Sequence, residues 1–213
     1  PGYPLGGYWA RPFVSFADNN GDGLISRVNC PGAPRLAGGP ECEVVLGDSA
    51  EFRGTPFPTR ELSFQTNATL FNVVKLSTLF DYKGGHKLFN STEEFRCSSF
   101  FTCETVQNRN SPLAEQARFA ARLLGTLDGY FEDADFVKWR EAAVTFMVPE
   151  SFNQRLGVRG LGLTLAGRNL KTWTDYSGFD PELNGAGQAN FSSFDFLTQP
   201  PVRYFTARVN FNF

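Results

Sequence analysis

The sequence is poor in several residue types and patterns that particular functions require. Among its 213 residues, Met147 is the only methionine and His86 the only histidine, which argues against a methionine-rich binding surface and a histidine-based metal centre. The net charge is -2 without any basic run, which argues against nucleic acid as a partner. No stretch of about 18 apolar residues occurs, and the mean hydropathy is -0.26, so the chain is not a helical membrane protein.

Catalytic and targeting motifs are also missing. The sequence contains no G-x-S-x-G, no H-E-x-x-H and no phosphate-binding loop, so we predict that the protein is not an enzyme and has no certain cofactor. The chain begins P-G-Y-P, without the basic start and apolar stretch of a signal peptide. We therefore expect a mature form or part of a longer polypeptide.

The four cysteines form two local pairs, Cys30 with Cys42 and Cys97 with Cys103. Neither pair has the C-x-x-C spacing of a metal site. Close pairs in loops are typical of disulfides and indicate a compartment outside the cytosol. Four free thiols are the alternative.

Aromatic residues, in contrast, make up 15% of the chain, and phenylalanine alone accounts for 23 residues. Many alternate with polar residues, as in strands that have one apolar and one polar face. The last such segment places Phe205, Val209, Phe211 and Phe213 on one face. This pattern is typical of the closing strand and insertion signal of an outer-membrane β-barrel, in which lipid covers one face.

Alternation predicts about six strands, at residues 9–16, 61–70, 73–83, 136–148, 158–168 and 202–213. Two connections are short, 71–72 and 149–157, and three are long and rich in Gly, Pro, Asn and Ser, namely 18–59, 84–133 and 171–201. Bacterial barrels have short periplasmic turns and long outer loops. We therefore expect extracellular long loops and a periplasmic C-terminus.

One short helix is expected in the second long loop. Ser111 is suited to cap it, Pro112 to its first position and Gly125 to its end. Its apolar stripe consists of Leu113, Ala117, Ala120 and Leu124. We expect the stripe to pack against the rest of the loop, with a partner-binding helix as the alternative.

Six strands cannot close a transmembrane barrel, for which about eight are the practical minimum. An open sheet edge in lipid leaves backbone groups without partners. We therefore predict an all-β fold, an antiparallel transmembrane β-barrel segment with long extracellular loops and one short loop helix. Residues 1–213 would be the C-terminal portion of the barrel domain, and other strands would come from the same polypeptide or from other subunits.

Several motifs resemble one family in their expected order. The chain is similar to the C-terminal portion of SusC/RagA-type TonB-dependent outer-membrane transporters. The matching segments are D-N-N-G-D-G-L-I at 18–25, A-D-F-V-K-W-R at 134–140, L-T-L-A-G-R-N-L at 163–170, where the family's strand ends in G-x-N-L, and Y-S-G-F-D-P-E at 176–182. The cysteine pairs and Trp139 depart from the family pattern, and they put the ligand in question rather than the fold.

The resemblance implies a barrel of about 22 strands, of which this chain would supply the last six. It also implies an N-terminal plug and a TonB-binding box, neither of which lies in this sequence. The implied activity is gated, proton-gradient-driven import of glycan oligomers or peptides, and the implied partners are TonB, a SusD-type surface lipoprotein and outer-membrane lipid.

The loop that begins at Asp18 is a candidate calcium site. Asp18, Asn20 and Asp22 would provide side-chain oxygens and Leu24 a backbone carbonyl, at positions 1, 3, 5 and 7 of a calcium loop. Position 12 is Asn29, so the usual bidentate glutamate is missing. The alternative is a tight turn bonded through its own side chains.

Other residues have simpler interpretations. Trp173 and Tyr176, and likewise Tyr3, Tyr8 and Trp9, fit an aromatic girdle at the membrane interface, with sugar stacking as the alternative. Arg168, Glu61 and Lys75 would point into the barrel interior. Asp180-Pro181-Glu182 is expected to form a structural turn, and His86 to be a solvated loop residue.

Two alternatives belong to other classes of protein. A secreted β-sandwich that binds carbohydrate with structural calcium shares the loops and aromatic residues, but it would stack Phe64, Leu163 and Phe211 against a second sheet. A glycan-cleaving enzyme would use Asp180 and Glu182 as its acid–base pair.

Overall fold

The computed structural model describes residues 2–187 and 193–212, and the chain divides into two compact units. The strand unit comprises Pro58–Gly85, Asp135–Asp175 and the residues from Pro200 onward. The loop unit comprises the residues up to Phe57, His86–Ala134 and Tyr176–Gln199. This division follows the predicted alternation of strands with long connections.

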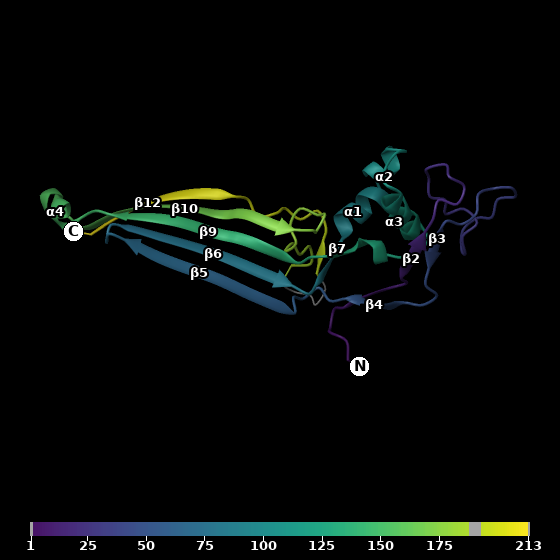
Figure 1. Cartoon of the computed structure of the whole chain (residues 1–213), viewed down its shortest axis with the longest axis horizontal. Coiled ribbons are helices and arrows are strands. Elements are labelled where there is room, and N and C mark those ends of the chain that lie inside the picture. Colours follow the sequence, from purple (N-terminus) through teal and green to yellow (C-terminus); the bar gives the residue numbers. More distant parts are fainter. Residues whose placement is uncertain (1, 188–192, 213) are drawn as a thin grey trace. The chain divides into compact units, whose positions relative to one another are not determined.

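Five long strands lie side by side in one antiparallel sheet of the strand unit (Figure 1). Their spatial order is β12-β10-β9-β6-β5. Their bounds are β5 Arg60–Leu70, β6 Val74–Gly84, β9 Phe136–Met147, β10 Arg159–Thr174 and β12 Tyr204–Asn212. Five of the six predicted strands are thus confirmed.

Short connections join the strands at one end of the sheet. Between β5 and β6, Phe71 and Asn72 both have positive φ (53° and 54°), and the Val73 N–H donates to the Leu70 carbonyl over 3.0 Å. Two such residues give a turn that matches the twist of a hairpin, as predicted. Between β9 and β10 lie the helical turns α4 (Glu150–Asn153) and η2 (Gln154–Leu156), which the sequence did not predict.

A bulge crosses the middle of the sheet. Arg140 is an extra residue of β9 relative to β6, because Leu79 pairs with Glu141 whereas Phe80 pairs with Trp139. Next to Arg140, strand β10 contains one extra residue relative to β9, because Arg168 pairs with Glu141 whereas Lys171 pairs with Trp139. The predicted end of this strand at Arg168 is therefore wrong: the G-R-N-L motif forms a bulge, and pairing continues to Thr174.

Strands β5 and β12 are the edges of the sheet in the described residues, so no closed barrel forms within them. The predicted first strand at 9–16 does not join this sheet. Because Pro12 lacks a backbone N–H, the segment splits into β1 (Tyr8–Ala10) and β2 (Phe13–Phe16), which pair with β4 (Glu51–Gly54) and β3 (Val44–Leu46) in the loop unit.

The loop unit contains more regular structure than the sequence predicted. Strand β7 (Lys87–Asn90) lies between β11 (Phe194–Asp195) and β8 (Phe131–Asp133) in a small sheet. The helices are α1 (Ser91–Ser98), α2 (Glu104–Gln107), α3 (Leu113–Leu123) and the 3-10 turn η1 (Asp128–Tyr130). The prediction of a single loop helix is therefore wrong.

Helix α3 is the helix that the sequence predicted, and it packs within the loop unit as expected. Ala120 and Ala121 are buried with Val44, and Phe13 and Leu124 pack against them. The predicted cap is displaced by one residue, because Pro112 occupies the N-cap position and the hydroxyl of Ser111 makes no hydrogen bond. Within the described residues, no helix is long and apolar enough to cross a membrane.

Candidate functional site

The register of the five strands gathers their apolar side chains on one side, which we call the apolar face. Paired residues of neighbouring strands point to the same side of a sheet. The apolar face consists of Leu62, Phe64, Ala68, Leu70, Val74, Leu76, Phe80, Tyr82, Val137, Trp139, Ala142, Val144, Phe146, Leu163, Leu165, Trp173, Phe205, Ala207, Val209 and Phe211.

Much of this face is exposed in the described chain. Phe64, Leu163 and Phe211 have exposed fractions of 58%, 37% and 50%, so they are not stacked against a second sheet and the sandwich alternative lacks its required packing. The predicted insertion-signal residues Phe205 and Val209 are also exposed. Phe213, the last of them, lies outside the described residues.

Polar atoms on the apolar face form hydrogen bonds within the sheet, and its side chains pack closely, as an apolar solvent requires. The indole N–H of Trp139 donates to the Thr78 hydroxyl over 2.7 Å, and that hydroxyl donates to the carbonyl of Glu141 over 3.0 Å. A Cβ atom on Gly167 would lie 2.9 Å from the Phe205 ring, so glycine permits that ring to cover the strand. The indole N–H of Trp139 and the hydroxyl of Thr78 are therefore satisfied within the sheet.

The opposite face carries the ion pairs of the sheet, whereas Lys171 is paired with Trp139 on the apolar face. Arg140 Nε lies 2.7 Å from an oxygen of Asp81, and Arg168 Nε lies 2.7 Å from an oxygen of Glu141. Oε1 of Glu61 lies 3.9 Å from Nζ of Lys83. Lys75 pairs with Thr145 on the same side. The three residues predicted to point away from lipid, Glu61, Lys75 and Arg168, thus share one face.

The loop unit contains a buried carboxylate, Asp195, which the sequence analysis did not single out. Its side chain is 0% exposed and accepts hydrogen bonds from the Tyr176 hydroxyl (3.0 Å) and the Thr92 hydroxyl (3.1 Å). Burial raises the pKa of Asp195, the two hydroxyls lower it, and Glu132 and Asp180 raise it further. Burial and the Asp195 charge also raise the pKa of Tyr176.

We expect Asp195 to make the loop unit less stable as the pH rises. Between the ordinary aspartate pKa of 3.8 and its raised folded value, the folded state holds a proton that the unfolded state has released. Stability therefore falls with increasing pH in this window. Hydrogen exchange around Thr92 in the full-length protein, corrected for intrinsic pH dependence, measures the effect, and Asp195→Asn is expected to remove it. The same pH dependence in both proteins would contradict the assignment.

The Asp18 loop forms the tight turn that was the alternative to a calcium site. Asp18 accepts the backbone N–H groups of Gly21, Asp22 and Gly23 over 2.7–3.2 Å, and Asp22 accepts that of Leu24 over 2.8 Å. These are Asx-type bonds in which the side chain holds its own turn. The carboxylate of Asp18 is thus already used by backbone donors.

Glu43, which the sequence analysis missed, closes this loop. It is 3% exposed, and its carboxylate accepts the Asn19 N–H (2.8 Å) and the Ser26 N–H (2.7 Å). Asn29, at position 12, is turned to the Leu36 N–H and the Pro40 carbonyl. Position 12 therefore offers an amide that is already bound elsewhere, both oxygens of Glu43 are occupied by backbone N–H groups, and calcium binding at Asp18, Asn20, Asp22 and Leu24 stays a prediction.

Both predicted disulfides are present, Cys30 with Cys42 and Cys97 with Cys103. Glu93 lies beside the second disulfide, and the three residues are the one His/Cys/Asp/Glu group in the described chain whose atoms are close enough to hold a metal ion. Disulfide sulfur is not a thiolate, which is the form that binds metals. This group therefore offers no metal site while the disulfide is intact.

Several interpretations of single residues need correction. Tyr176 and Tyr8 are buried in the loop unit, where burial raises the pKa of Tyr8 to about 12, so neither belongs to an interface girdle. Trp173 lies on the apolar face and is 43% exposed, as a girdle residue would be. His86 is buried rather than solvated. Asp180 accepts the Glu182 N–H over 2.9 Å and forms the predicted turn.

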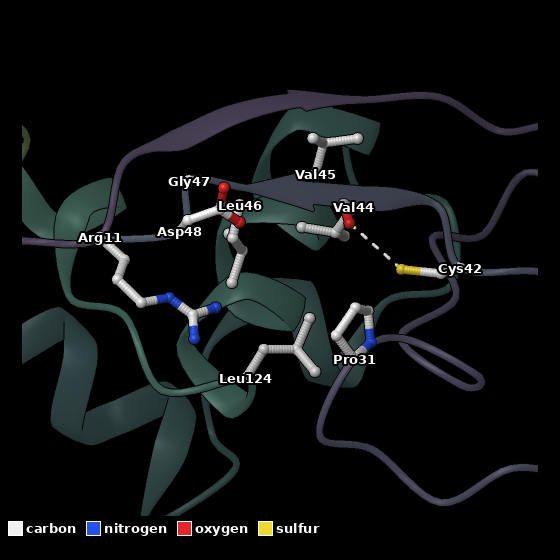
Figure 2. Close-up of a pocket in the computed structure, with 9 residues that line it drawn as sticks. All are labelled: Arg11, Pro31, Cys42, Val44, Val45, Leu46, Gly47, Asp48 and Leu124. Carbon is white, nitrogen blue, oxygen red and sulfur yellow. Dashed lines mark hydrogen bonds between the residues drawn. The ribbon is translucent and has the colours of Figure 1, made fainter. Parts of the chain in front are cut away.

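A cavity of about 390 Å³ opens in the loop unit. Figure 2 shows its wall, in which Val44 and Leu46 of β3 lie across from Pro31 and Leu124. Arg11 and Asp48 provide its charged groups. The sulfur of Cys42 lies 3.1 Å from the Val44 carbonyl oxygen, so the Cys30–Cys42 disulfide adjoins the cavity.

Comparisons with known proteins agree with this architecture. No protein-family model matches the chain. TonB-dependent receptor P3 of Formosa agariphila is 28% identical over 203 residues, which are 93% of this chain and 19% of the receptor. The RagAB peptide importer in its open-open state is 18% identical and has a TM-score of 0.63 over 100% of this chain and 23% of its own chain. In its closed-closed state, the TM-score is 0.55 over 82% and 20%.

The chain thus spans about a fifth of the length of the relatives that it matches. Its fold is that of a strand-and-loop portion of a TonB-dependent transporter. The chain is a relative of the SusC/RagA-type TonB-dependent transporters, as the order of its sequence motifs predicted.

Proposed function

We propose that the chain forms part of the wall and outer mouth of an outer-membrane TonB-dependent transporter. The observation that carries this proposal is the exposed apolar face, five strands wide, opposite a face of paired charges. An outer-membrane barrel wall requires this combination, because lipid covers one side and water or a plug the other.

The height of the apolar face supports this proposal. At about 3.4 Å per residue, the stretch of β6 from Val74 to Tyr82, which pairs with Phe146 to Val137 of β9, extends about 27 Å along the strand. A strand tilt of about 40° reduces this to about 21 Å across the bilayer, close to the apolar band of about 25 Å that such barrels present. Aromatic rings of Tyr82 and Trp173 mark one border and Phe146 and Phe211 the other.

The remaining strands of a barrel of about 22 strands, a plug and a TonB-binding segment would belong to the rest of the transporter. The loop unit would face the cell exterior and the short connections the periplasm. The cargo would be peptides or glycan oligomers, imported at the expense of the proton gradient, and a SusD-type lipoprotein would cover the mouth. The match to a peptide importer supports peptides in particular.

Uptake by intact cells tests the proposed activity. Deleting the gene of the full-length transporter is expected to abolish uptake of either labelled oligopeptides or labelled oligosaccharides, and the gene supplied in trans should restore it. A protonophore should stop uptake in the wild type within minutes. Undiminished uptake of both cargoes in the deletion strain would refute the proposal.

A further inference from the structure

The cavity beside β3 combines a cationic side chain, Arg11, with apolar lining residues. The Nε–H of Arg11 is buried and has no hydrogen-bond acceptor within the described residues. Figure 2 shows the guanidinium group of Arg11 extending toward Leu46 and Leu124. The guanidinium group as a whole lines the cavity wall, so an oxyanion in the cavity would meet a fixed positive charge and N–H donors suited to it.

The other groups of the cavity restrict what that ligand can be. Leu46, Leu124 and Pro31 provide an apolar surface, and Asp48 provides an exposed acceptor at the same cavity. A carboxylate, a neighbouring N–H group and an apolar substituent are what the last residue of a peptide presents. The volume of about 390 Å³ lies in the range of small-molecule sites.

We propose that this cavity binds the C-terminal residue of a peptide cargo. Arg11 holds the α-carboxylate, Asp48 accepts the N–H of the last peptide bond, and the apolar side chain lies against Leu46 and Leu124. The assignment rests on the proposed import function and names its cargo. An acidic sugar fits less well, because none of the residues that line the cavity is aromatic and sugar hydroxyls would find few polar partners.

Calorimetric titration of the purified full-length transporter in detergent tests this assignment. The probes are N-acetyl-Ala-Ala-Leu with a free carboxylate, the same peptide as its C-terminal amide, and a glucuronate disaccharide. The wild type is expected to bind the free acid at least about tenfold more tightly than the amide, since a charge-assisted hydrogen bond is lost in the amide. Arg11→Gln should bind both peptides equally weakly.

Arg35→Gln is the matched control, because Arg35 is an exposed arginine of the same unit and its loss should leave the preference for the acid unchanged. The fitted stoichiometry reports the folded fraction of each variant. Equal binding of acid and amide by the wild type, no binding of any probe, or a preference that survives Arg11→Gln would overturn the assignment. Tighter binding of the disaccharide through Arg11 would also overturn it. Uptake by cells tests the import function separately. A transporter that imports cargo but shows no preference for the free acid would refute the peptide site and leave the proposed import function standing.

Discussion

Ala207→Arg is expected to impair assembly of the full-length transporter severely. Ala207 lies on the apolar face of β12, opposite Leu165 of β10, in the middle rows of that face. An arginine near the bilayer midplane destabilises an outer-membrane barrel by about 2–4 kcal/mol. The measurements are the urea midpoint of unfolding in lipid vesicles and the amount of heat-modifiable protein in the outer membrane.

Thr206→Arg provides the control for this substitution. Thr206 is the preceding residue of the same strand and is paired with Ala166 on the opposite, charged side. An arginine there would meet water or the plug, so we expect nearly wild-type assembly. Equal damage from both substitutions would show that the two faces do not differ in their surroundings, which would contradict a membrane-spanning sheet.

Glu43→Ala is expected to destabilise the Asp18 loop by about 2–4 kcal/mol. The substitution removes the carboxylate that accepts the N–H groups of both Asn19 and Ser26, and a hydrogen bond to a charged group contributes about 1.5–3 kcal/mol. Limited proteolysis of the full-length protein should show much faster cleavage within residues 18–42. The backbone bonds of Ala17 and Ser26 to residue 43 remain available, so the rest of the unit should stay folded.

Two further variants distinguish this role from a general effect of charge. Glu41→Ala removes an exposed carboxylate two residues away and should leave the cleavage rate unchanged. Glu43→Gln keeps one acceptor oxygen, and its cleavage rate should be intermediate. Wild-type resistance in Glu43→Ala would contradict the assignment of Glu43 as the residue that closes the loop.

The long strands could be predicted because one face of each is apolar over its full length. The alternation of apolar and polar residues is interrupted within strand β9, and the bulge explains why. Val137 and Trp139 share the apolar face with Ala142 and Val144 only because Arg140 is an extra residue between them. An extra residue reverses the alternation at that point, and no local signal in the sequence marks it.

The loop unit could be predicted only in outline. Helix α3 has its own periodic stripe, and the cysteine spacing predicted both disulfides. Strands β7, β8 and β11 are each two to four residues long, too short for a periodic pattern. The contacts of Asp195 with Thr92 and of Arg11 with its cavity join residues far apart in the chain, so only the folded structure brings them together.

The charged face of the sheet has a consequence for the solutes that would pass along it. The carboxylates of Glu61, Asp81 and Glu141 each have a basic side chain beside them on these strands. These carboxylates are already neutralised by their basic neighbours, so a cation that passes along this wall would bind them only weakly. Discrimination between cargoes would then be decided at the entrance, before any solute reaches the strands.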